Sequence, residues 1–85
     1  MDKYEETKDI LNAMADVKMK MNQHKGDIEK LDANFLIKLL KSEVVELEEA
    51  CSKVDLIHVI EEAADAQNYL VALVHKQISI YRSRK

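Results

Sequence analysis

Proline and tryptophan are absent from this chain of 85 residues, and glycine occurs once, at Gly26. Proline and glycine are the residues that most often break a helix or form a turn. Their scarcity argues against a fold of many short elements, and glutamate, lysine, leucine and alanine are abundant instead. The composition therefore predicts an all-α fold.

Cysteine is also nearly absent, because Cys51 is the single one. It has no partner for an intramolecular disulfide, and no cysteine and histidine cluster has the spacing of a zinc site. A domain of this size buries only about 60–65% of its unfolded surface, so a small protein without such links needs another source of stability. We therefore predict a single domain over residues 1–85 that forms a homodimer or homotetramer, with Cys51 as a small buried side chain.

Long apolar runs are missing as well. No stretch approaches the roughly 20 apolar residues of a membrane-spanning helix, and the first six residues are too polar for a signal peptide. We therefore expect no membrane partner and a cytoplasmic location, with which a reduced Cys51 agrees. The net charge of −3 argues against nucleic acid as a partner, because phosphate binding favours a basic surface.

Apolar residues recur at the three-to-four spacing of a helix in three segments. The first helix is expected at about residues 3–22, the second after the N-cap Asp32, and the third from about Leu56 to Tyr81. Turns are expected around Gly26 and from Ser52 to Asp55, and the short second connection predicts that the second and third helices lie antiparallel. The expected apolar stripes are Ile10, Leu11, Met14, Val17 and Met21; Phe35, Leu36, Leu39, Leu40, Leu47 and Ala50; and Val59, Ile60, Ala63, Leu70, Val74 and Ile78.

Two pairs of acids lie within the second and third of these helices. Glu43 and Glu46 form one pair, and Glu62 and Asp65 form the other. Residues three apart share a helix face, so each pair points two carboxylates the same way, and two packed helices would bring four to one place. Because like charges repel, such a cluster needs a counter-charge, and a divalent cation is the most economical one.

The position of Glu43 favours a metal site. It follows Leu36, Leu39 and Leu40 at helical spacing, where a core residue is expected, and a buried acid is costly unless it is paired or bound to metal. Carboxylates suit Mg²⁺ or Mn²⁺, which would neutralise a polyphosphate and activate a water for attack on phosphorus. The alternative is that both pairs are ordinary surface charge on exposed helix faces.

The segment from Glu43 to Glu46, followed by the segment from Glu62 to Asp65, resembles the ordered ExxE and ExxD motifs of the MazG-like all-α nucleoside triphosphate pyrophosphohydrolases. The similarity covers about residues 23–76. The segment His24-Lys25-Gly26-Asp27 and the later Asn68-Tyr69 are similar to the small phage and bacterial branch described as dATP/dGTP diphosphohydrolases.

This resemblance implies Mg²⁺-dependent hydrolysis of (deoxy)nucleoside triphosphates, purine dNTPs foremost, to the monophosphate and pyrophosphate. It implies a three-helix protomer that forms a four-helix-bundle core in a dimer or dimer of dimers, in the cytoplasm of a bacterium or phage-infected host. Glu49 matches a further acid of the family. Carried over residue by residue, the metal-binding and catalytic residues would be Glu43, Glu46, Glu62 and Asp65, and the substrate-binding residues would be His24, Lys25 and Asn68.

A competing hypothesis is a non-catalytic helical module that binds nucleotides or partner helices. It predicts no stabilisation by divalent metal, whereas the enzyme hypothesis predicts that metal and nucleotide together raise the unfolding temperature. Asn68 likewise has a second interpretation, as a side chain whose hydrogen bond packs two helices together. The hydrogen-bond partner of Asn68 in the fold distinguishes substrate binding from helix packing.

Overall fold

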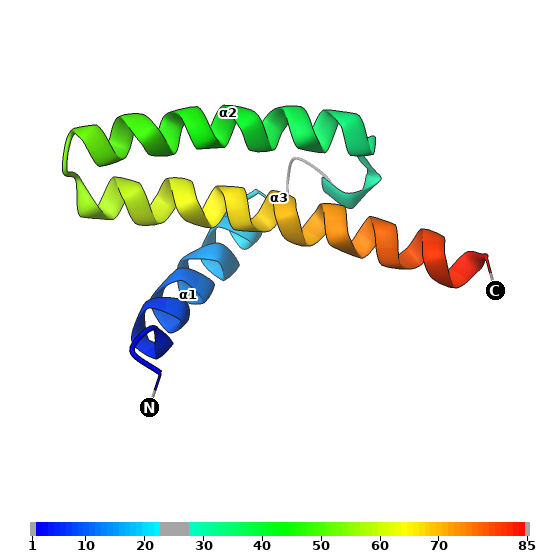
Figure 1. Ribbon diagram of the computed structural model, residues 1–85, viewed down its shortest axis with the longest axis horizontal. Helices are drawn as coiled ribbons and strands as arrows, with labels where there is room; N and C mark the ends of the chain where they lie inside the picture. Colours follow the sequence, from blue (N-terminus) through cyan, green and yellow to red (C-terminus); the bar gives the residue numbers. More distant parts are fainter. Residues whose placement is uncertain (1, 23–27, 85) are drawn as a thin grey trace.

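The structure, a computed structural model, describes residues 2–22 and 28–84. Within these ranges it consists of α-helices, one short 3-10 helix and no strand (Figure 1). The all-α, three-helix prediction is therefore confirmed for this part of the chain. In chain order, the elements are α1 at Glu5–Met21, η2 at Ile28–Lys30, α2 at Ala33–Ser52 and α3 at Leu56–Ser83.

The predicted helix starts are confirmed, with one difference in capping. Asp55 caps α3, and its carboxylate accepts a hydrogen bond from the backbone N–H of His58 at 3.2 Å. Asp32 occupies the N-cap position of α2, but its side chain makes no capping hydrogen bond. Ser52 was expected in the turn but is the last residue of α2, and α3 continues two residues beyond Tyr81 to Ser83.

The turn between α2 and α3 contains a strained residue. Val54 has a φ of 53°, which lies in the left-handed region that a β-branched side chain normally avoids. This conformation costs about 1–2 kcal/mol. The cost is offset because the short turn reverses the direction of the chain. This reversal lets α3 pack antiparallel against α2, as the sequence predicted (Figure 1).

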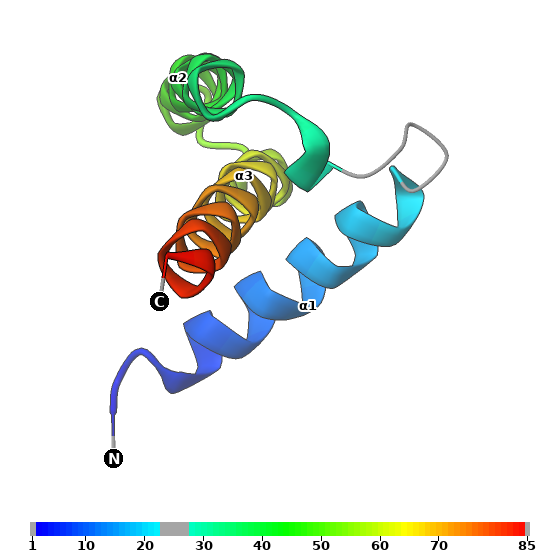
Figure 2. The ribbon, with the colours of Figure 1, turned by 90° about the vertical axis from the view of Figure 1, so that its right-hand side faces the viewer.

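The helix α3 is the centre of the fold. It packs along α2 on one side, while α1 crosses it obliquely on another and η2 also contacts it (Figures 1 and 2). The last turns of α3 extend past the N-terminal end of α2 in Figure 1. The C-terminal part of α3 therefore has little of the protomer packed around it.

The core is small and consists mostly of alanine. Among the described residues, the buried apolar ones are Ala15, Leu36, Ala50, Ala64 and Ala72. Alanine side chains let helix backbones approach closely, which suits the crossing of α1 over α3. They also contribute little apolar area, so burial within one protomer stabilises the fold only weakly.

Several residues predicted to be buried are exposed. Leu70, Val74 and Ile78 of the third apolar stripe are 46%, 54% and 42% exposed. The same is true of Ile10, Val17, Met21 and Phe35, and Cys51 is exposed rather than buried. The periodicity identified an apolar face correctly, but three helices in this arrangement cover only part of it.

The chain exposes more surface than a compact protein of its mass. Its accessible surface is 6707 Å², against about 5,200 Å² expected for a compact 9.8 kDa protein. Its radius of gyration is 14.3 Å, against about 12 Å expected for this length. Among the described residues, no helix has both the length and the apolar character that crossing a membrane requires.

Candidate functional site

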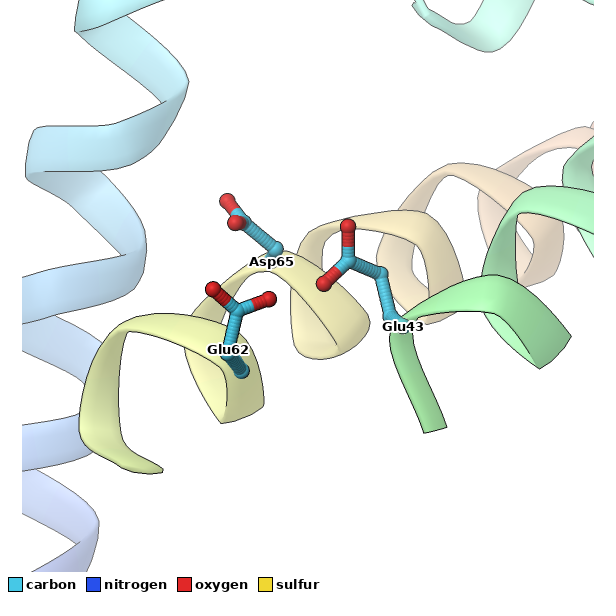
Figure 3. Close-up of side chains that lie close together, drawn as sticks. All are labelled: Glu43, Glu62 and Asp65. Atoms are coloured by element: carbon cyan, nitrogen blue, oxygen red, sulfur yellow. The ribbon is translucent and has the colours of Figure 1, made fainter. Parts of the chain in front are cut away.

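Three of the four predicted acids meet between α2 and α3. Glu43 extends from α2, and Glu62 and Asp65 extend from α3, so that the three carboxylates face one another (Figure 3). One carboxylate oxygen from each residue lies within 4.8 Å of the others. Ala64, fully buried between the two acids of α3, is small enough for this close helix packing. We call these three residues the acid cluster.

Glu46 lies at the rim of the acid cluster. Its side chain is exposed. The interaction of its carboxylate with that of Glu62 raises the pKa of Glu46. Glu46 and Glu62 also line a pocket with Glu49, the further acid named from the sequence, and with Lys53 and His58. The ExxE pair therefore meets the ExxD pair, but Glu46 is not among the three closest carboxylates.

The acid cluster is electrostatically strained. Burial, together with the neighbouring acids, raises the pKa of Glu43 to about 8. Burial also raises the pKa of Asp65, whereas the protonated Glu43 beside it lowers the pKa of Glu62. The Oε2 atoms of both Glu43 and Glu62 are buried without a hydrogen-bond partner. The protein itself thus leaves part of this negative charge uncompensated.

Among the described residues, two basic side chains border the acid cluster, and sequence reasoning selected neither for the site. The Nζ of Lys18, on α1, lies 3.5 Å from Oδ2 of Asp65 and 3.9 Å from Oε2 of Glu61. The Nε2 of His58 lies 3.2 Å from Oε1 of Glu62. The spacing of four residues from His58 to Glu62 was a usable signal. Lys18 offered none, because a helix distant in sequence brings it to Asp65.

Of the three predicted substrate-binding residues, the structure describes only Asn68. Asn68 lies one turn beyond Asp65, and its Nδ2 donates a hydrogen bond to the backbone carbonyl of Ala15 at 2.9 Å. It therefore joins α3 to α1, as the packing interpretation of Asn68 expected, and it also lines a pocket of about 90 Å³ with Asp65 and Tyr69. His24 and Lys25 lie outside the described residues.

The donor set of the acid cluster fits a hard divalent cation. Its ligand atoms are carboxylate oxygens, which Mg²⁺ and Mn²⁺ prefer, and two of these oxygens are buried without a partner. The side chains of Glu62 and Asp65 are only 12% and 19% exposed, so little water screens their mutual repulsion. A cation held here would relieve that repulsion.

Comparisons with known proteins add nothing to this geometry. No family model matches the chain, and neither a curated protein nor a solved structure matches it. Any functional proposal therefore rests on the residues and their arrangement.

The thermal stability of the metal-free protein should fall as pH rises from about 5 to about 8, and then level off. Because the pKa of Glu43 is about 8 in the folded protein and 4.5 in the unfolded chain, the folded state holds this proton more tightly and loses stability as the proton leaves. Asp65 acts in the same direction, while Glu62 stays ionised throughout this range because its pKa is lowered. We expect a decrease of about 5–10 °C in the unfolding midpoint, measured by circular dichroism.

Excess Mg²⁺ should largely abolish this decrease, because the ion binds the ionised, folded acid cluster. Glu43→Gln provides the control, since it removes the titrating group and should flatten the profile without metal. A midpoint that is independent of pH in the wild type would contradict the electrostatic description of the acid cluster.

Proposed function

We propose that this protein is a Mg²⁺-dependent nucleoside triphosphate pyrophosphohydrolase of the MazG-like type, acting on (deoxy)nucleoside triphosphates and foremost on purine dNTPs. The observation that supports it is the acid cluster, in which Glu43, Glu62 and Asp65 converge from two antiparallel helices. The order of the two motifs in the sequence agrees with the convergence of three of their side chains in the packing.

In this proposal Glu43, Glu62 and Asp65 hold the cation, and Glu46 completes the set from the rim. When bound, Mg²⁺ would neutralise the triphosphate and acidify the attacking water, and Mn²⁺ would serve as an alternative. The neighbouring Glu62 raises the pKa of Glu46, so a cation held beside both carboxylates would relieve their mutual repulsion. Asn68 lies one turn beyond Asp65 on α3, and its hydrogen bond to the backbone carbonyl of Ala15 orients its side chain.

The reaction consumes one water for each triphosphate. The water oxygen forms a bond to the α-phosphorus, and the bond from that phosphorus to the oxygen bridging the β-phosphorus breaks. The water proton passes to a carboxylate of the site, and nucleoside monophosphate and pyrophosphate leave. The chain contains no glycine-rich phosphate loop, so phosphate binding falls to the cation and to individual basic side chains.

We propose a homodimer or homotetramer as the active unit in the cytoplasm, with a four-helix-bundle core. The protomer exposes about 1,500 Å² more than a compact monomer of its mass, as the difference between 6707 Å² and about 5,200 Å² shows. A typical stable interface buries about 800 Å² per partner, so this excess is large enough to supply one. Four exposed apolar residues of α3 that line one shallow pocket, which we call the α3 stripe, are Leu70, Val71, Val74 and Ile78.

A substrate panel tests the proposed activity. Purified protein is incubated with each common NTP and dNTP, with Mg²⁺, with Mn²⁺ or with a chelator, and the products are separated by chromatography. We expect monophosphate and pyrophosphate in equal amounts, only with metal, and fastest with purine dNTPs. Release of inorganic phosphate alone, or no hydrolysis of any nucleotide with either metal, would contradict the proposal and favour a non-catalytic module.

A further inference from the structure

Lys18 is the basic residue of α1 that reaches the acid cluster. Its side chain is only 20% exposed, and its Nζ lies 3.5 Å from Oδ2 of Asp65. Its second acidic neighbour, Glu61 at 3.9 Å, lies outside the acid cluster. A lysine held at this position gives Asp65 the positive charge that a bound cation would otherwise supply.

A divalent ion at Asp65 and the ammonium of Lys18 would repel each other. Both carry positive charge, and both are attracted to the same carboxylate in a place with little water to screen them. The lysine side chain has a flexible four-carbon stem, so its Nζ can leave Asp65 while the backbone of α1 stays in place. Lys18 then keeps Glu61 as an acidic neighbour and can take a second negative partner beside the acid cluster.

We propose that Lys18 is a substrate-binding residue that exchanges Asp65 for a phosphate oxygen of the nucleotide when the divalent cation binds. This inference rests on the proposed function, because it takes the triphosphate as the incoming anion. A metal held by Asp65 carries its phosphate ligands close to it, since Mg²⁺–oxygen distances are about 2.1 Å. A phosphate oxygen offers the ammonium a charge-assisted hydrogen bond in place of the carboxylate.

The exchange predicts opposite effects of one substitution on two ligands. Lys18→Met keeps the apolar stem and removes the charge. Without nucleotide, the substitution removes the ammonium group that competes with the metal for Asp65, so Mn²⁺ should bind about tenfold more tightly. With metal at saturating concentration, it removes a contact to the triphosphate, so a non-hydrolysable deoxynucleoside triphosphate analogue should bind about tenfold more weakly. Calorimetric titration measures both affinities.

Three variants serve as controls. Lys20→Met removes an exposed charge two residues away on α1 and should change neither affinity by more than about twofold. Asn12→Ala removes a different polar link between α1 and α3, the hydrogen bond from Nε2 of Gln67 to Oδ1 of Asn12 at 2.8 Å. Lys18→Arg keeps the charge and should retain near wild-type affinity for both ligands.

A purely structural role for Lys18 gives a different result. In that case Lys18→Met and Asn12→Ala would both lower the unfolding midpoint and weaken the binding of metal and of analogue together. Any result in which Lys18→Met fails to tighten Mn²⁺ binding, or fails to weaken analogue binding, overturns the exchange. If Lys18→Met does not fold, Lys18→Gln carries the same expectations.

The two proposals fail in distinguishable ways. Wild-type protein that binds Mn²⁺ and the analogue but hydrolyses no nucleotide contradicts the proposed activity, while the affinities of Lys18→Met still decide the exchange. Wild-type protein that hydrolyses dNTPs, with a KM that does not change in Lys18→Met, contradicts the exchange alone. We expect the substitution to raise KM about tenfold with a smaller effect on kcat, because the contact exists before the chemical step.

Discussion

Replacing Glu43 by glutamine should lower the metal-dependent turnover of dNTPs by roughly a hundredfold to a thousandfold, without loss of stability in the metal-free protein. Glutamine keeps the shape of the side chain but removes the negative charge that would bind the cation. At neutral pH it also resembles the protonated form that Glu43 itself favours in the metal-free fold, because its pKa is about 8. Steady-state kinetics and thermal melts at pH 7 and 9 measure the two effects.

Glu48→Gln is the matched control for this prediction. It makes the same chemical change on the same helix, at an exposed position outside the acid cluster, and should leave turnover within about twofold of wild type. Asp65→Asn and Glu46→Gln should also lose activity. If Glu43→Gln retained a tenth of wild-type turnover or more, the catalytic cation would have to lie elsewhere.

Introducing a charge into the α3 stripe should dissociate the proposed dimer or tetramer. We expect the wild-type protein to sediment as a dimer or tetramer and Val74→Lys to sediment as a monomer, with a dissociation constant at least about a hundredfold higher. The reason is that Val71, Val74 and Ile78 follow the three-and-four spacing of a helix-packing seam and are exposed in the protomer. Assembly would bury the lysine ammonium group away from water, which is energetically costly. Sedimentation velocity over a range of concentrations measures the change.

Ser79→Lys separates this effect from the addition of a charge to α3. Ser79 is exposed and lies five residues beyond Val74, about 140° further round the helix. It should therefore assemble as the wild type does. A Val74→Lys protein with unchanged mass would show that the α3 stripe does not mediate self-association.

Assembly through the α3 stripe is compatible with an open acid cluster. Val74 follows Asp65 by nine residues, which is two and a half turns of a helix, so the two side chains point to opposite faces of α3. A second copy that covers Val74 would therefore leave Asp65 and its neighbours accessible to nucleotide. The same helix can serve catalysis on one face and assembly on the other.

Much of the fold was predictable because helix formation is local. The periodicity of apolar residues and the scarcity of glycine and proline predicted three helices, and Asp32 and Asp55 predicted where two of them begin. The two acid pairs were recognisable for the same reason, since three-residue spacing places both members on one face. Their convergence followed from the short turn that forces α2 and α3 to run antiparallel.

The burial of the apolar stripes was predicted wrongly, for a physical reason. Periodicity identifies which face of a helix is apolar, but it does not say how far a neighbouring helix covers that face. Leu70, Val74 and Ile78 lie on such a face, yet α1 crosses α3 at an angle and leaves them exposed (Figure 2). Cys51, on α2, is exposed as well.

The sequence by itself determined the three helices, the order of the two acid pairs and the position of Glu43 within an apolar stripe, because these depend on residues a few positions apart. Tertiary structure alone decided which carboxylates come closest, with Glu43, Glu62 and Asp65 together and Glu46 at the rim. It also decided that Lys18 reaches Asp65 from α1. Contacts between distant segments depend on the crossing of helices, which local spacing does not encode.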